Sequence, residues 1–289
     1  MHQRLLFRPL FPILLALSSA ACSGPDDPGQ STGTAQASAI AVAQATGALP
    51  SAAASVAAGP VAFADSASTE GDRSGSRKFS YSWPAAVSAI PALAQQLTQD
   101  RDKALADQKA QWKAAQATSV ADCPACRSFE TSEEWQVVAA LPQWLSLSDK
   151  LYTYTGGAHG MSGLRSLVWD KAAGRALDGK ALFRSPAALQ RALGSKLCAA
   201  LDRQRAKKRG EPVPGAGGPL GFDNCPELSD ATILPGSSSG THFDRIGIWF
   251  GPYVAGPYAE GSYELTFPVD AAVIDAVKPE YAGAFAIAR

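Results

Sequence analysis

The order of strand-like and helical runs along the chain is the feature that most constrains its fold. Short runs rich in aromatic and β-branched residues predict strands at 79–83, 133–141, 143–155, 164–170, 245–250 and 262–267. Helical runs are set apart from these strands and span 84–118, with an interruption at Pro91, 185–208 and a short stretch from Val269. Strands that neighbour strands in this way predict an α+β fold, with a mostly antiparallel sheet and helices packed on one face.

The segment from residue 22 to residue 76 has the composition of a flexible tether. Fourteen alanines fall within residues 35–64, interleaved with Ser, Gly, Thr, Gln and Pro. Large apolar side chains are too few there to offset the entropy cost of ordering the chain. We therefore expect a disordered tether over 22–76, followed by an ectodomain over 77–289 with an N-terminal part (77–140) and a C-terminal part (141–289).

The first 21 residues have the pattern of a bacterial lipoprotein signal peptide. Arg4 and Arg8 form a basic region, and the apolar run PLFPILLALSSAA that follows is too short for a stable transmembrane helix. Residues 19–22 resemble a lipobox, in which the thiol of Cys22 is acylated; an ordinary signal peptide cleaved at a small residue is the alternative. Ser23 is similar to the residues that follow the cysteine in outer-membrane lipoproteins. The predicted location is the bacterial cell envelope, lipid-anchored at the outer membrane and facing the periplasm.

The charges of the chain balance, because Lys and Arg together number 26 and Asp and Glu together number 26. No long-range field would attract nucleic acid or an anionic membrane surface, so we expect membrane contact through the lipid anchor only. The basic run RQRAKKR at 203–209 is expected to consist of solvated cations that the helix dipole stabilises. Contact with a polyanion is the alternative for this run.

Beyond the leader, the chain has four cysteines, an even number that suits an oxidising compartment. They are Cys123, Cys126, Cys198 and Cys225, and they allow three pairings. We favour Cys123–Cys126 and Cys198–Cys225, because the second bridge would hold the Gly/Pro-rich loop before Cys225 against the helix that carries Cys198. The C-x-x-C pair also allows a redox interpretation, but the long helix before it is unlike a thioredoxin pattern.

A strand-like run of tyrosines ends in the motif GGAH. There Gly156 and Gly157 allow a positive φ and an abrupt turn before His159. One interpretation is that the His159 imidazole bonds the neighbouring backbone and stabilises the turn. The other places His159 on a surface shared with tyrosines, which supply rigid amphipathic contact area for a sugar or a protein. The candidate ligand-binding residues are Tyr154, Gly156, Gly157, His159, Tyr253 and Tyr258.

A metal site and a catalytic site are weaker interpretations of the same region. Cys123, Cys126, His159 and His242 are zinc-ligand types, but the two histidines lie too far apart in the sequence for a compact zinc motif. The segment GMSG lacks the G-x-S-x-G pattern of a nucleophile elbow, and nothing in the sequence marks an acid behind His159. We therefore predict no metal, no cofactor and no catalytic residue. The six tryptophans are expected to pack in the core or on sheet faces.

Two motifs resemble a family of bacterial extracytoplasmic domains. The segment YTYTGGAHGMSGLRSLVWDKAAGRALDGKALF, at 152–183, resembles the ectodomain of RsiV-type anti-sigma factors and the accessory region of PdaC-type deacetylases. The segment IGIWFGPYVAGPYAEGSYELTFPVD, at 246–270, is similar to a second signature of that family. Its matching residues are Phe250, Pro252, Tyr253, Pro257, Tyr258, Ala259 and Gly261.

This resemblance implies a binding module in the cell envelope. In RsiV relatives the domain binds lysozyme, and in PdaC relatives it accompanies a catalytic domain. A deacetylase of that type needs a metal triad with an H-x-x-x-H segment, which this sequence lacks. We expect a non-catalytic module whose partner is a lysozyme-like muramidase or a peptidoglycan fragment. The alternative is a cell-wall-directed hydrolase or deacetylase that uses His159.

Overall fold

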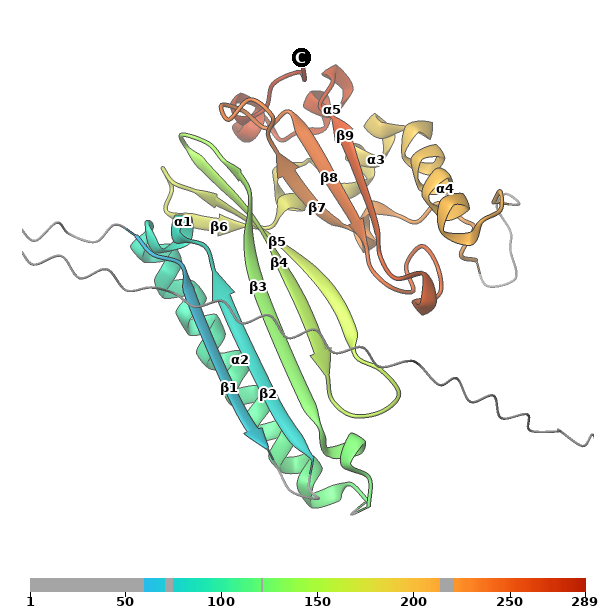
Figure 1. Cartoon of the computed structure of the whole chain (residues 1–289). Coiled ribbons are helices and arrows are strands. Elements are labelled where there is room, and N and C mark those ends of the chain that lie inside the picture. The colour runs from blue at the N-terminus through green and yellow to red at the C-terminus, as the bar shows by residue number, and fades with distance from the viewer. Residues whose placement is uncertain (1–59, 71–74, 121, 214–220) are drawn as a thin grey trace, which may run out of the picture. The chain divides into compact units, whose positions relative to one another are not determined.

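The computed structural model of the chain describes residues 60–70, 75–120, 122–213 and 221–289 (Figure 1). The predicted signal peptide (1–21), the lipidation candidate Cys22 and most of the predicted tether lie outside these residues. Among the helices of the described ranges, none combines the length and the apolar character needed to cross a membrane.

Six strands form the first sheet, in the spatial order β1-β2-β3-β4-β5-β6. They are β1 (Phe63–Glu70), β2 (Ser76–Trp83), β3 (Phe129–Ala140), β4 (Trp144–Tyr154), β5 (Met161–Asp170) and β6 (Arg175–Leu177). Neighbouring strands are antiparallel except β2 and β3, which run parallel. Parallel neighbours need a crossover connection, and here it consists of α1 (Ala85–Ser88) and α2 (Pro91–Thr118).

The long helix α2 runs beside β1 and β2 and packs on one face of this sheet (Figure 1). Phe79, Tyr81 and Trp83 alternate along β2, so all three side chains are buried on the same face. Leu93 and Leu97 lie one helical turn apart on α2 and are buried in the same cluster. Each such side chain contributes about 1.5–3 kcal/mol by leaving water. The cluster also contains Val87, Trp135, Leu145, Leu147, Leu167 and Trp169.

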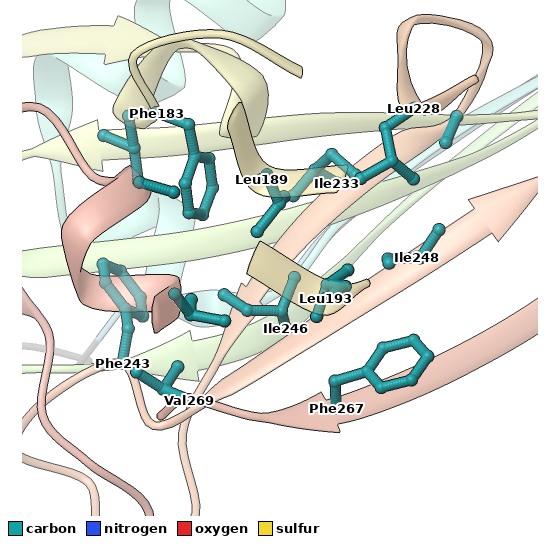
Figure 2. Packing of buried hydrophobic residues seen from close by; sticks show 14 of the residues in the cluster. Phe183, Leu189, Leu193, Leu228, Ile233, Phe243, Ile246, Ile248, Phe267 and Val269 are labelled. Carbon is teal, nitrogen blue, oxygen red and sulfur yellow. The ribbon is translucent and has the colours of Figure 1, made fainter. Parts of the chain in front are cut away.

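Three antiparallel strands form the second sheet: β7 (Thr232–Gly236), β8 (Arg245–Phe250) and β9 (Tyr263–Pro268). One face of it packs against α3 (Pro186–Leu193), α4 (Ser195–Arg209) and α5 (Ala271–Ala276). Figure 2 shows Ile246 and Ile248 of β8 in one cluster with Leu189 and Leu193 of α3. Short 3-10 turns complete the described elements: η1 (Pro124–Arg127), η2 (Gly179–Leu182), η3 (Leu228–Asp230), η4 (Tyr258–Glu260) and η5 (Pro279–Ala284).

Helices α3 and α4 replace the single helix that the sequence predicts over 185–208. The Ser185 hydroxyl accepts a hydrogen bond from the Ala188 amide at 3.0 Å, and Pro186 occupies the first turn, as predicted for the start of the helix. Gly194 then adopts φ 54° and ψ −142°, which ends α3. A glycine inside a helix costs only about 1 kcal/mol, so its presence in the sequence did not by itself predict the break.

Strand β1 corrects the predicted end of the tether. The composition predicts a tether over 22–76, but residues 63–70 pair with β2 along its whole length. The Phe63 ring stacks on Trp83, with ring centroids 4.0 Å apart. The main-chain ladder and this aromatic pair order a segment whose own composition contains little to bury.

The α+β class and the packing of helices on one face of the sheet are confirmed. Strands β6 and β7 were not predicted; both are short, with little alternation to reveal them. The predicted division between 77–140 and 141–289 falls between β3 and β4. These two strands pair in one sheet, so the division does not separate two structural parts.

Candidate functional site

The GGAH turn connects β4 to β5 and packs on the C-x-x-C segment. Gly156 and Gly157 have φ values of 89° and 99°, which glycine adopts without steric cost. A Cβ atom on Gly156 would lie 2.9 Å from the carbonyl oxygen of Cys126, so this glycine also permits a close approach. The Tyr154 hydroxyl lies 2.9 Å from the carbonyl oxygen of Gly157 and 3.2 Å from that of Ala125. Tyr154 therefore holds the turn and the C-x-x-C segment together.

Three rings from two distant parts of the sequence meet beside this turn. His159 stacks on Tyr258 with centroids 3.8 Å apart, and Tyr253 lies 5.6 Å from Tyr258. The Tyr258 hydroxyl donates to the carbonyl oxygen of Gly160 at 2.7 Å, and Nδ1 of His159 lies 3.0 Å from the same oxygen. We call His159, Tyr253 and Tyr258 the aromatic cluster. The His159 ring therefore lies against the backbone of its own turn and against Tyr258. Tyr154, the third candidate tyrosine, contacts the turn through its hydroxyl and makes no ring contact with the cluster in the described part of the chain.

Tyr253 has an unfavourable backbone conformation for a residue with a Cβ atom. Its φ is 69°, and it is the only non-glycine residue there with a positive φ. The left-handed region costs a residue with a Cβ on the order of 1 kcal/mol or more. The side chain is 50% exposed, so burial does not repay this cost. The conformation directs an aromatic ring toward solvent next to Tyr258.

Three cations of the basic run 203–209 hold the loop that carries the two tyrosines. Arg205 is buried and donates to the carbonyl oxygen of Ala255 at 2.9 Å. Lys208 donates to the carbonyl oxygen of Ser262 at 2.5 Å, and Arg209 donates to the Glu260 carboxylate at 2.8 Å. The prediction of solvated cations is therefore wrong for Arg205 and Arg209, whose partners lie in a segment about 50 residues away.

The charges around Glu260 are fixed by hydrogen bonds. Burial works to raise the pKa of Glu260, but the hydrogen bonds from Arg209 and Tyr263 outweigh it and hold the pKa below its usual range. Burial and the bond to Glu260 raise the pKa of the Tyr263 phenol to about 12. The carboxylate thus stays ionised and anchors the loop over the ordinary pH range.

A groove extends from the aromatic cluster between the two sheets. Three adjoining hollows of about 280, 270 and 350 Å³ form it. The first two share Lys150, Trp249 and Glu264 in their walls, and the last two share Ser162 and Ser262. We call this continuous depression the inter-sheet groove.

Trp249 is the aromatic residue of the groove that sequence reasoning assigned to packing. Along β8 the side chains of Ile248 and Phe250 are buried in the helix-covered core. Trp249 lies between them and points to the opposite face, which borders the groove. The alternation in RIGIWF predicts that Trp249 lies on the other face of β8 from Ile248 and Phe250. Only the packing of the two sheets shows that this face borders a groove.

Both favoured disulfides are confirmed. Cys123–Cys126 and Cys198–Cys225 have Cα separations of 5.3 and 5.4 Å. The thiols of Cys123 and Cys126 are therefore engaged with each other, and the zinc interpretation loses two of its four ligands.

Neither histidine in the described part of the chain has a carboxylate hydrogen-bonded to its ring. His242 lies 3.2 Å from the Thr241 hydroxyl, whereas Asp244 accepts from the Ser238 amide at 2.8 Å. Burial works to raise the pKa of Asp244, but the bonds from Ser238 outweigh it and lower the pKa. The nucleophile–base–acid arrangement of a hydrolase triad is not assembled around either ring.

A family model that matches part of the chain agrees with the resemblance that the GGAH motif carries. Two solved structures of DUF3298 family proteins are similar to the chain, each at 16% identity. The one from Bacteroides fragilis covers 77% of this chain and 96% of its own, with a TM-score of 0.40. The one from Pseudomonas aeruginosa covers 79% and 96%, with a TM-score of 0.45. No curated protein matches the chain. Residues 73–162, a range that includes β2 and the GGAH turn, match the family described as Deacetylase PdaC, so this part of the chain is similar to that family.

Proposed function

We propose that the protein is a lipid-anchored module of the bacterial cell envelope that binds a peptidoglycan fragment or a lysozyme-like muramidase without catalysis. The observation that carries this proposal is Tyr253, an exposed aromatic residue held in a strained conformation beside Tyr258 and His159. Strain of this kind persists where the surrounding structure imposes it, and it concentrates at functional sites.

The chemistry of the aromatic cluster favours binding. Tyrosine rings supply a large contact area at low entropy cost, and such residues dominate the energy of many interfaces. The hydroxyl of Tyr258 and Nδ1 of His159 are both directed at the Gly160 carbonyl oxygen, and the two stacked rings cover one face of each other. The half-exposed ring of Tyr253 therefore offers contact area for a partner. The same bonds hold the rings in place before a ligand arrives, which reduces the cost of ordering them on binding.

The test compares Tyr253→Asn with Tyr253→Phe in the full chain. Asparagine tolerates a positive φ, so Tyr253→Asn should leave the free energy of unfolding unchanged or raise it by about 0.5–1 kcal/mol. It should also weaken capture of the ligand at least tenfold, as expected for an aromatic contact residue. Tyr253→Phe keeps both the ring and the strain and should retain binding. Pull-down and titration with lysozyme and with soluble muropeptides measure the effect.

Two outcomes would contradict the proposal. Turnover of peptidoglycan, seen as released acetate, sugar or peptide that disappears in His159→Ala, would establish the hydrolase or deacetylase alternative. Failure to capture either muropeptides or lysozyme would leave the cluster without the proposed role. Stoichiometric capture without turnover, lost in Tyr253→Asn, would support it.

The lipid anchor is tested separately. Acylation at Cys22 predicts that Cys22→Ser releases the protein from the outer-membrane fraction, because one thiol carries the anchor. Cys123→Ser is the matched control, since it removes a cysteine that pairs within the ectodomain. Retention of the Cys22→Ser protein in membranes would contradict the anchor.

A further inference from the structure

The inter-sheet groove is long and open, which suits an extended chain better than a compact molecule. Its wall on β4 runs from Ser148 to Tyr152, and a second wall runs from Thr266 of β9 to Ser262, the residue before that strand. Four residues of strand span ~13 Å, so the groove is longer than one sugar ring along each wall. It then continues to Tyr258 at the aromatic cluster.

Trp249 supplies the aromatic surface in the middle of the groove. It lines both central hollows and is only partly buried, although it lies in a strand whose neighbouring side chains are in the core. A partly exposed indole offers an apolar face together with a polar N–H at its edge. Ligands with flat apolar faces and polar edges, such as pyranose rings, match this combination.

The charged side chains that line the two central hollows are one cation and two anions. Lys150 is the only cationic side chain that lines the two central hollows, and Glu134 and Glu264 are the carboxylates there. Glu134 lies opposite Lys150 across β3 and β4, yet Lys150 has no ion pair or hydrogen bond within the described residues. Glu134 instead accepts a hydrogen bond from the Gln136 amide at 2.8 Å.

This arrangement distinguishes between classes of anionic ligand. A densely charged polyanion would meet repulsion from Glu134 and Glu264, which line the same hollows as Lys150. A strand of neutral sugars that carries single, spaced carboxylates would place one carboxylate at Lys150. Its hydroxyl groups could then donate to the two glutamates.

We propose that the inter-sheet groove binds a glycan strand that carries spaced carboxylate groups. Trp249 is the stacking surface for the sugar rings, and Lys150 selects the carboxylate. This inference rests on the proposed function, because it names the glycan as the ligand of the binding module and the groove as its site. The aromatic cluster then contacts the strand where it leaves the groove.

Isothermal titration calorimetry of the full chain tests the inference with two glycans of equal length. One is a peptide-free hexasaccharide of alternating N-acetylglucosamine and N-acetylmuramic acid, and the other is neutral chitohexaose. The wild-type chain should bind the acidic glycan at least tenfold more tightly, which is about 1.4 kcal/mol. Added salt should reduce this preference, since screening weakens an exposed charge pair.

Single substitutions distinguish the role of Lys150 from that of Trp249. Lys150→Met should remove the preference for the acidic glycan and leave chitohexaose binding unchanged, whereas Lys109→Met, at an exposed lysine of α2, should bind like wild type. Trp249→Ala should weaken binding of both glycans at least tenfold, and Trp249→Phe should retain most of it. Thermal unfolding checks each fold. If Trp249→Ala does not fold, the exposed Lys150 decides the outcome alone.

The results that overturn the inference differ from those that overturn the proposed function. Selection of a carboxylate at Lys150 would be excluded if the wild-type chain bound both glycans with equal affinity. It would also be excluded if Lys150→Met and Lys109→Met had the same preference for the acidic glycan. Capture of lysozyme with no binding of either glycan would show that the groove is not a glycan site. The proposed function as a binding module would not be affected by that result. No binding of glycans, muropeptides or lysozyme would eliminate both.

Discussion

At the scale of single residues, the two glycines of the GGAH turn have different tasks. Both adopt a positive φ, but their surroundings differ. A Cβ atom on Gly156 would press on the Cys126 backbone, whereas one on Gly157 would meet nothing within 4 Å. The sequence predicts a turn at both positions, and only the packing on the C-x-x-C segment distinguishes them.

Alanine substitutions at these two glycines should therefore have unequal effects. Gly157→Ala should lower the free energy of unfolding by about 1 kcal/mol, the cost of a left-handed conformation for a residue with a Cβ. Gly156→Ala should lower it by a further 1–3 kcal/mol or so, because the turn must also move away from Cys126. Denaturant unfolding measures both. Equal losses would show that the turn does not depend on this contact.

At the scale of elements, β3, β4 and β5 bring together a partly buried ion cluster. Arg165 of β5 contacts Glu133 of β3 and Asp149 of β4, and its Nε atom lies 2.7 Å from Asp149. Burial raises the pKa of Glu133 and of Asp149 in spite of the attraction of Arg165. The charge of Arg165 therefore does not fully offset the cost of burying the carboxylates of Glu133 and Asp149.

The raised pKa values predict a specific pH dependence. A carboxyl group with a raised folded-state pKa contributes stability below its unfolded pKa, and that contribution is lost as pH rises through the folded-state value. Glu133→Gln should therefore match wild type at about pH 4 and gain relative stability as pH rises above that. Chemical denaturation across pH 4–8 measures the difference, with the exposed Glu280→Gln as control. A difference that is independent of pH would contradict the raised pKa.

The two disulfides should stabilise the fold by different amounts. They close loops with sequence separations of 27 and 3 residues. On the chain-entropy model, replacing Cys198 and Cys225 by serine should cost about 3–4 kcal/mol, and replacing Cys123 and Cys126 about 2 kcal/mol. Unfolding of each double variant measures the loss. A larger loss for the Cys123–Cys126 pair would indicate that this bridge also supports the GGAH turn.

At the scale of the whole molecule, β1 extends the folded part beyond the predicted boundary. A chain that begins at residue 60 should unfold like the full chain, whereas one that begins at Ser76 should lose about 2–4 kcal/mol, because Trp83 loses the Phe63 ring and β2 becomes an edge. Thermal unfolding of the two truncated chains tests this. Equal stability of the two truncated chains would show that residues 60–75 add nothing to the fold, as the predicted tether up to residue 76 implies.

The sequence alone determined those features that short-range patterns encode. The alternation at 79–83 and 245–250 predicted β2 and β8. Pro84 and Ser185 marked the starts of helices, and Pro91 marked the interruption at which α2 begins, because each signal depends on a few neighbouring residues. The GGAH motif and the segment at 246–270 pointed to His159, Tyr253 and Tyr258 as separate candidate residues. They could not show that the rings of His159, Tyr253 and Tyr258 meet.

Tertiary structure alone decided the features that depend on contacts between distant segments. The hydroxyl of Tyr258 reaches Gly160 across 98 residues of sequence, and Arg205 reaches Ala255 across 50. The strand at 63–70 forms because β2 offers it a partner, and the inter-sheet groove exists because the residues of the two sheets that line it do not pack completely against each other. Such contacts depend on which strands pair and where the helices cover them, and this choice is made by the free energy of the whole fold.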